Sequence, residues 1–205
     1  NQWGGRNSHP LWGFDQVLLE RGYVLLNVNI RGSWGLGREF RRKMQRDYGG
    51  IDVEDVRSGA HFLASLGYVD PDRIGLWGSS YGGLMTAMSL FTYPGVYAAG
   101  VAGEMRVMDR PQDYPAEYAD SSPFTKVEGL EDPLMIVHGM RDWIVLFKDS
   151  LVLLEHAMLH GKGHLIEFVP LPNAPHGWDT VELYQTRYAF KKMIAFFDRH
   201  LRPAG

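Results

Sequence analysis

Short apolar runs of strand length alternate with longer segments of helical period along nearly the whole chain. Five runs, bounded by Gly, Pro or Asp, are predicted to form buried strands: Tyr23–Ile30, Arg73–Trp77, Tyr97–Ala102, Pro133–Val137 and Leu165–Val169. Five intervening segments with apolar spacings of three and four predict helices: Phe14–Arg21, Val53–Leu66, Leu84–Phe91, Phe147–His160 and Val181–Leu201. The alternation predicts an α/β fold with a doubly wound, mostly parallel sheet, helices on both faces, and ligands beyond the carboxyl ends of the strands.

Composition narrows the function classes. At 205 residues and 45% hydrophobic, the chain is long enough for one core, and we expect a single domain over residues 1–205. A net charge of −3 argues against nucleic-acid binding, and we interpret the basic run Arg38–Arg46 as a solvated helix face. The absence of cysteine excludes disulfides and thiol nucleophiles. No apolar run approaches the roughly 18 residues that span a bilayer.

The stretch Gly103–Ser122 is the least regular part of the sequence. Its prolines and acids interrupt both the helical and the strand period. We therefore expect a loop or cap over the active edge of the sheet.

The turn at Gly78–Gly82 has the pattern Gly-x-Ser-x-Gly, with Ser80 at its centre. A predicted buried strand precedes it and a predicted helix follows, which is the setting of a nucleophile elbow. In such a turn the neighbours two before and two after are small, and the serine oxygen projects at the top of the sheet. The pentapeptide alone is a weak signal, so the prediction of Ser80 as a nucleophile depends on this context.

A serine hydroxyl needs a base to accept its proton, and the base needs an acid to orient it. In the α/β-hydrolase order the acid follows the serine and the histidine comes last. Asp142 lies just past the run Pro133–Val137, 62 residues after Ser80, and His176 follows the last predicted strand by a short loop, 34 residues further on. Asp179 also lies three residues after His176 and remains an alternative partner for it.

Other histidines offer weaker candidates. His138 precedes the loop that should hold the acid. His156, His160 and His164 are spaced by four, which on one helix could hold zinc, but Gly161 and Gly163 should end that helix first. We predict no metal and no cofactor, and we interpret these three histidines as a solvated face.

The oxyanion of a tetrahedral intermediate needs hydrogen-bond donors. The backbone N–H of Tyr81, directly after the nucleophile, is the first candidate. Trp3-Gly4-Gly5 could supply a second donor or could be a plain glycine turn.

Stretches along almost the whole chain carry a family resemblance: "GYVLLNVNIRGSWGLGREF", "IDVEDV", "YVDPDRIGLWGSSYGG", "SSPFTKVEGLEDPLMIVHGMRD" and "PHGW". With them the chain resembles the C-terminal catalytic domain of the prolyl oligopeptidase family of serine peptidases, in its dipeptidyl peptidase IV and acylaminoacyl peptidase branches. The resemblance implies an α/β-hydrolase fold, Ser80, Asp142 and His176 as the catalytic residues, and Tyr81 as an oxyanion donor. It also implies a β-propeller ahead of this domain, short peptides as substrates, and a chain lacking the first strands of the fold.

The sequence departs from the family pattern at three places. The His/Tyr-Gly-Gly-Pro segment would fall before Asn1, only Glu117-Tyr118 matches the Tyr-x-Glu-Arg-Tyr segment faintly, and Trp143-Ile144 stand where Asp-Asn is usual after the acid. These groups bind the substrate carbonyl and shape the proline pocket in the family. Tyr81 and Val145 are the residues that we expect to line a small apolar pocket here.

Three functional hypotheses follow. The first is a serine peptidase that acts on short peptides through an acyl-enzyme, and the second is an esterase on the same fold. The third is a catalytically silent module. Self-association, and a cytoplasmic or periplasmic compartment, are left open by the sequence.

Overall fold

The computed structural model describes residues 13–44, 47–105, 107, 111–180 and 183–201, and its core is a parallel sheet. Four strands, β1 (Gly75–Ser79), β2 (Ala99–Gly103), β3 (Leu134–Gly139) and β4 (Ile166–Leu171), pair in that order. Each pair is parallel, so the strands end at the same edge of the sheet. Four predicted strands are thus confirmed, and each begins one or two residues later than predicted.

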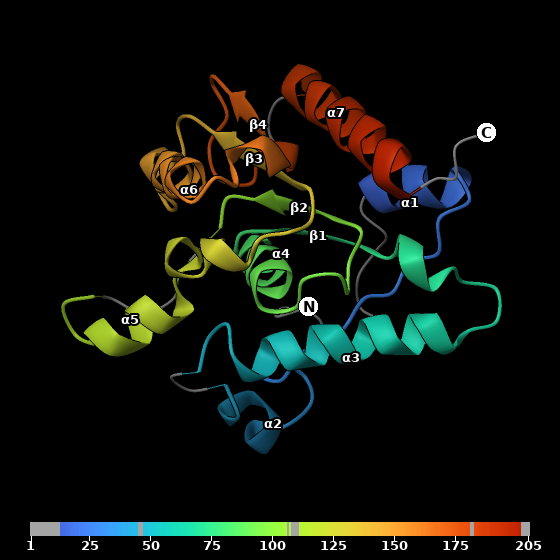
Figure 1. The fold of residues 1–205 in the computed structure, drawn as a ribbon, viewed down its shortest axis with the longest axis horizontal. Coiled ribbons are helices and arrows are strands. Elements are labelled where there is room, and N and C mark those ends of the chain that lie inside the picture. Colours follow the sequence, from blue (N-terminus) through green and yellow to red (C-terminus); the bar gives the residue numbers. More distant parts are fainter. Residues whose placement is uncertain (1–12, 45–46, 106, 108–110, 181–182, 202–205) are drawn as a thin grey trace.

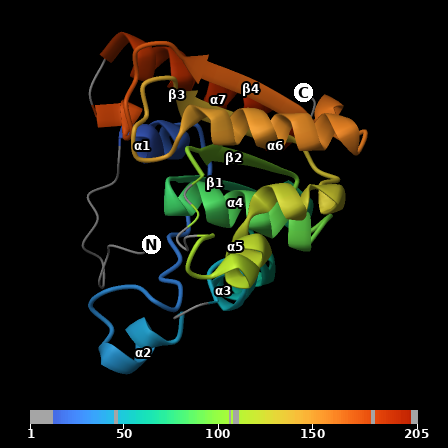
Figure 2. The same cartoon turned by 90° about the vertical axis from the view of Figure 1, so that its left-hand side faces the viewer.

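Helices cover both faces of the sheet (Figure 1). On one face lie α1 (Gly13–Glu20) and α7 (Leu183–Leu201), and on the other lie α4 (Tyr81–Thr92) and α6 (Phe147–Leu159). In both Figure 1 and Figure 2, α3 (Ile51–Ser65) lies outside α4 and α4 separates it from the sheet. The predicted layering is confirmed.

The two faces of the sheet belong to different hydrophobic clusters. Along β3, Leu134 and Ile136 pack with α4 and α6, whereas Met135 and Val137 pack with α1 and α7. Because successive strand side chains point to opposite faces, a run that is apolar at every position must be covered on both sides. All six residues of β3 are buried, so this strand lies at the centre of the core.

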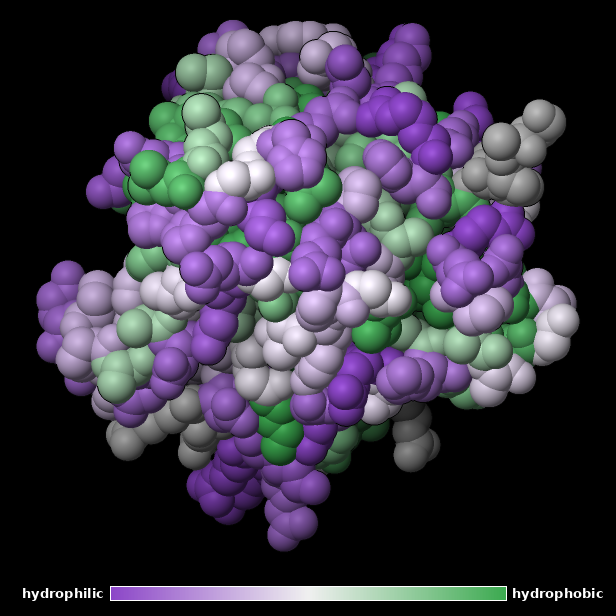
Figure 3. Space-filling model, in the orientation of Figure 1, coloured by the Kyte–Doolittle hydropathy of each residue, from purple (hydrophilic) through white to green (hydrophobic). Residues whose placement is uncertain are grey.

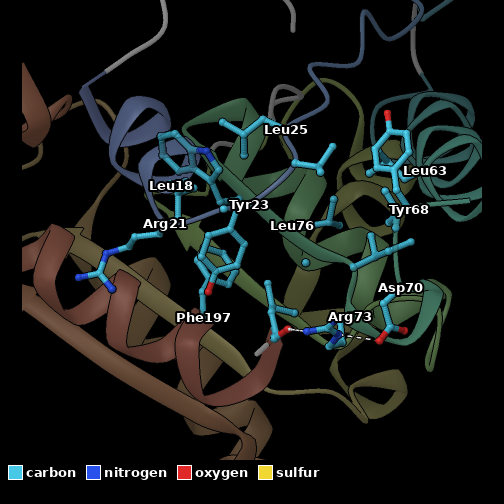
Figure 4. A pocket seen from close by; sticks show the side chains of 17 residues that line it. Leu18, Arg21, Tyr23, Leu25, Leu63, Tyr68, Asp70, Arg73, Leu76 and Phe197 are labelled. Atoms are coloured by element: carbon cyan, nitrogen blue, oxygen red, sulfur yellow. Dashed lines mark hydrogen bonds and ion pairs between the residues drawn. The ribbon is translucent and has the colours of Figure 1, made fainter. Parts of the chain in front are cut away.

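The prediction of a strand at Tyr23–Ile30 is wrong. These residues form no helix or strand, and a cavity of about 380 Å³ separates their first part from β1 (Figure 4). Tyr23 and Leu25 line this cavity on one side, and Leu76 lines it from β1. A strand needs a hydrogen-bonded neighbour, and no described strand pairs with this segment. Of its apolar side chains Ile30 is buried, whereas Val24 and Leu26 are exposed.

The irregular stretch after β2 contains one helix that the sequence analysis missed, α5 (Pro115–Ser121). Pro115 is the first helical residue, a position at which the absent N–H of proline costs no hydrogen bond. Short 3-10 segments complete the connections: Pro71–Arg73, Pro123–Thr125, Val127–Gly129, Gly163–Leu165 and Trp178–Thr180.

The basic run includes the short helix α2 (Arg38–Arg42), which has no buried residue. Arg41 lies over the ring of Trp34, 4.2 Å from its centroid. The face of the molecule in Figure 3 is mostly hydrophilic, with hydrophobic residues in small separate patches. No helix of the described residues is long and apolar enough to span a membrane.

Candidate active site

Ser80 lies between the last residue of β1 and the first residue of α4. Its backbone has φ +59°, in the left-handed region that L-residues adopt at a cost. The turn is held at both ends, since Ser80 N donates to Gly103 O at 2.9 Å and Leu84 N donates to Ser80 O at 3.1 Å. The predicted elbow is therefore present, and its strain is maintained by β2 and α4.

The glycines of the elbow have different roles. A Cβ added to Gly78 would lie 2.5 Å from the main chain of Gly82, and one added to Gly83 would lie 2.0 Å from Gly103 O. A Cβ added to Gly82 would meet nothing within 4 Å. The close approaches therefore require glycine at 78 and 83, and Gly82 serves as the backbone against which Gly78 packs.

The structure brings Ser80, His176 and Asp142 together although they are far apart in sequence. His176 Nε2 lies 3.0 Å from Ser80 Oγ, and His176 Nδ1 lies 2.7 Å from Asp142 Oδ2. Because a carboxylate oxygen only accepts, Nδ1 carries the imidazole proton and Nε2 accepts from the serine hydroxyl. Of the two acids that the sequence offered, Asp142 is the one hydrogen-bonded to the imidazole.

The loops that hold Asp142 and His176 are joined through their backbones. Met140 N donates to Leu171 O at 2.9 Å, and Arg141 N donates to Ala174 O at 3.0 Å. A Cβ on Gly139 would lie 2.3 Å from Ala174 O, so the loops approach to a distance that only glycine permits. The parallel pairing of β3 with β4 thus places the acid and the base side by side.

Asp142 is held in one orientation by its own loop. Its Oδ1 accepts hydrogen bonds from the backbone N–H groups of Ile144 at 2.8 Å and Val145 at 2.9 Å. His138 Nε2 lies 3.1 Å from Val145 O and 3.4 Å from Asp142 Oδ2, and its Nδ1 lies 2.7 Å from Ser150 Oγ. Burial lowers the pKa of His138 and so favours its neutral form. Through these contacts its ring supports the Asp142 loop.

Glu104 is a site residue that the sequence analysis missed. It follows β2 directly and is fully buried, with φ +26°. Burial raises its pKa to about 7, while the Ser79 hydroxyl and the charge of His176 act in the opposite direction. The signal was available, because Glu104 follows a predicted strand just as Asp142 does.

Glu104, Asp142 and His176 each place one potential ligand atom within 4.8 Å of the others. Two carboxylates and an imidazole at this spacing could surround a cation. In the described structure these atoms are hydrogen-bonded to protein groups instead. The expectation that no metal is used stays a prediction.

Tyr81 and Val145, the predicted pocket residues, are both 4% exposed. The Tyr81 hydroxyl donates a hydrogen bond to the buried carboxylate of Asp52. Burial raises the pKa of Asp52 to about 6. Burial and the Asp52 carboxylate together raise the pKa of Tyr81. The backbone N–H of Tyr81 lies in the first turn of α4, where a helix has no internal acceptor for it. This N–H is therefore available to a ligand, and the pocket role of both residues stays a prediction.

The three histidines spaced by four do not join this site. His160 lies 3.2 Å from Glu128, His164 Nδ1 lies 3.0 Å from Gly161 O, and the ring of His156 packs against Phe124. The three histidines thus have different partners, and the expectation that they hold no zinc stays a prediction. Trp3-Gly4-Gly5 lies outside the described residues.

Known proteins share this sequence pattern and fold. The model of the prolyl oligopeptidase family matches residues 13–204. A protein of Metarhizium robertsii named "Probable dipeptidyl-aminopeptidase B" is 33% identical over 156 residues, which cover 68% of this chain and 17% of that protein. Dipeptidyl aminopeptidase BIII of Pseudoxanthomonas mexicana is 25% identical over 198 residues, covering 84% of this chain and 28% of the relative. The chain therefore spans under a third of either relative.

Solved structures confirm the predicted α/β-hydrolase fold. A Bacteroides ovatus protein assigned as a dipeptidyl aminopeptidase IV has a TM-score of 0.84 and 26% identity, covering 92% of this chain and 28% of that one. The acylaminoacyl peptidase of Pyrococcus horikoshii has a TM-score of 0.76 and 23% identity, covering 86% and 32%. On the family match over residues 13–204, this chain belongs to the prolyl oligopeptidase family of peptidases.

Proposed function

We propose that this chain is a serine peptidase domain that hydrolyses peptide bonds of short peptides through an acyl-enzyme intermediate. The observation that carries the proposal is the continuous hydrogen-bonded path from Ser80 Oγ through His176 to Asp142, at 3.0 and 2.7 Å. Membership of a peptidase family supports the reaction class.

In the first half-reaction Ser80 Oγ attacks the peptide carbonyl carbon while its proton passes to His176 Nε2. Asp142 stabilises the imidazolium and keeps it oriented, because its carboxylate is fixed by two backbone N–H groups. The imidazolium then gives the proton to the leaving amine nitrogen, the C–N bond breaks, and the acyl group remains as an ester on Ser80.

In the second half-reaction a water molecule gives a proton to His176 Nε2 and attacks the ester carbonyl carbon. The proton returns to Ser80 Oγ as the C–O bond breaks, which releases the acid product and restores the enzyme. In both steps the N–H of Tyr81 donates to the developing oxyanion, and the elbow holds that N–H next to Oγ.

The family relatives support short peptides as the substrate class. Two carry dipeptidyl aminopeptidase names, and a structural neighbour is an acylaminoacyl peptidase. We further propose that the domain works beside a β-propeller, which is consistent with relatives several times longer than the chain.

The proposal is tested by reaction of the purified protein with a fluorophosphonate probe, and by comparing hydrolysis of a dipeptide anilide with that of a nitrophenyl ester. We expect one probe molecule per chain, located at Ser80 by peptide mapping, and turnover of the anilide. The Ser80→Ala variant should neither label nor turn over either substrate.

Two results would overturn the proposal. Turnover of the ester alone would indicate an esterase on the same fold. A folded protein that does not label would indicate a silent module, since an intact nucleophile and base should react with the probe whatever the substrate preference.

A further inference from the structure

Two non-glycine residues of the described chain have positive φ, and each directly follows one of two neighbouring strands. Ser80 follows β1 with φ +59°, and Glu104 follows β2 with φ +26°. Strained backbone persists where surrounding contacts hold it, and it concentrates at functional sites. The strain at Ser80 belongs to the elbow, whereas the catalytic steps above do not use Glu104.

The Glu104 carboxylate joins the two halves of the site. Ser79 Oγ, beside the nucleophile, donates to Glu104 Oε2 at 2.9 Å. Gly177 N, beside the base, donates to Glu104 Oε1 at 3.1 Å. Gly177 itself has φ +69°, a backbone conformation that favours glycine. One side chain thus connects segments 25 and 73 residues away.

A fully buried carboxylate is costly unless hydrogen bonds compensate for its lost hydration. A small apolar residue at this position would avoid that cost but could not accept the hydrogen bonds from Ser79 and Gly177. We propose that Glu104 is a positioning residue that fixes the His176 loop against the Ser80 elbow and whose negative charge strengthens His176 as a base. The inference rests on the proposed function, because it assigns Glu104 a role through the proposed base.

The charge part of the proposal follows from the groups that face Glu104. They are His176 from the loop after β4 and Asp142 from the loop after β3, with the Ser79 hydroxyl from the elbow. Asp179 is a third carboxylate that acts on His176. An ionised Glu104 attracts the positive charge of the imidazolium, whereas a neutral group in its place would not.

Two substitutions separate the two parts of the role. Glu104→Gln keeps an acceptor for Gly177 N and offers an N–H to Ser79 Oγ, so it keeps the connection and removes the charge. Glu104→Leu removes both the charge and the acceptor that Ser79 Oγ and Gly177 N share. Asp198→Asn, in α7, is the control, because that helix end packs near Gly75 at the opposite end of the strands.

The primary measurement is the pKa and tautomer of the His176 imidazole by ¹⁵N NMR, with the resonance assigned through His176→Gln. We expect His176 to lose its imidazolium proton at a lower pH in Glu104→Gln than in wild type, and to keep the Nδ1–H tautomer. The second measurement is the fluorophosphonate labelling rate against pH. Its acid limb should move in the same direction in Glu104→Gln, and its plateau should fall at least tenfold in Glu104→Leu.

An unchanged His176 pKa in Glu104→Gln would overturn the charge role, and wild-type labelling in Glu104→Leu would overturn the connection. If Glu104→Leu does not fold, Ser79→Ala takes its place, since it removes one donor only; labelling equal to wild type would then count against the connection. If wild-type protein does not label at all, the proposed function fails, whereas the NMR titration still decides the role of Glu104.

Discussion

Gly139 and Ala174 meet backbone to backbone at the point where the Asp142 loop passes the His176 loop. A Cβ on Gly139 would lie 2.3 Å from Ala174 O and 2.8 Å from Pro175 O. Backbone atoms cannot move aside as a flexible side chain can. The distance between acid and base is therefore set by main-chain packing, with side-chain hydrogen bonds completing it.

We expect Gly139→Ala to separate these loops, because its methyl group cannot be accommodated without a backbone shift. The free energy of unfolding should fall by about 2 kcal/mol, as for other overpacked sites, and the labelling rate of Ser80 should fall at least tenfold. Urea denaturation and fluorophosphonate labelling measure these effects. Gly67→Ala, where an added Cβ meets nothing within 4 Å, is the matched control and should change neither.

The elbow glycines provide a second pair. Gly83→Ala should lower the free energy of unfolding by about 2 kcal/mol, since its Cβ would lie 2.0 Å from Gly103 O. Gly82→Ala, which adds a methyl into open space within a helix, should be neutral or slightly stabilising. Thermal or urea denaturation decides between them. The sequence motif includes Gly82 and not Gly83, so the motif alone would predict the larger loss at Gly82. Equal losses for both variants would contradict the steric assignment.

The nucleophile position should show the cost of its backbone strain. At φ +59° an alanine is strained as the serine is, whereas glycine is not. Both Ser80→Ala and Ser80→Gly should be unreactive toward the probe. Ser80→Gly should nevertheless be more stable than Ser80→Ala by about 1 kcal/mol, measured by urea denaturation. The reverse order would show that the elbow is relaxed.

Asp52 should make stability depend on pH. Burial raises its pKa to about 6, above the ordinary value of 3.8, so between these two pH values the folded state binds more protons than the unfolded state. The free energy of unfolding that the Asp52 carboxyl contributes is therefore lost as pH rises from about 4 to about 6. Relative to wild type, Asp52→Asn should gain about 3 kcal/mol in the free energy of unfolding between pH 4 and pH 7.

Asp70→Asn is the control for that titration. The hydrogen bond from Arg73 lowers the pKa of Asp70, so the stability that this group contributes is present above the ordinary aspartate value of 3.8 and is lost only as pH falls below it. Denaturation curves from pH 4 to pH 7 should show no pH-dependent difference between this variant and wild type. If the difference in free energy of unfolding between Asp52→Asn and wild type does not change with pH, the pKa of Asp52 is not raised by burial.

Local sequence patterns were sufficient for much of this protein. The spacing of apolar residues predicts four strands and their helices, and the glycines of a strand-to-helix turn predict the elbow. Both signals come from residues that are close together in the sequence. Ser80, Asp142 and His176 could be selected because each follows a strand, and parallel strands end at one edge of a sheet.

Pairing and burial were decided by residues far away in the chain. Tyr23–Ile30 has strand composition, but a strand forms only where a neighbour supplies hydrogen bonds, and no described strand lies beside it. Glu104 has the same place in the sequence pattern as Asp142, yet its carboxylate accepts from the backbone N–H of Gly177, 73 residues away. The sequence by itself determined the elements and the candidate nucleophile, acid and base, whereas tertiary packing decided which acid contacts His176 and which carboxylate is buried, because both depend on distances that no local pattern records.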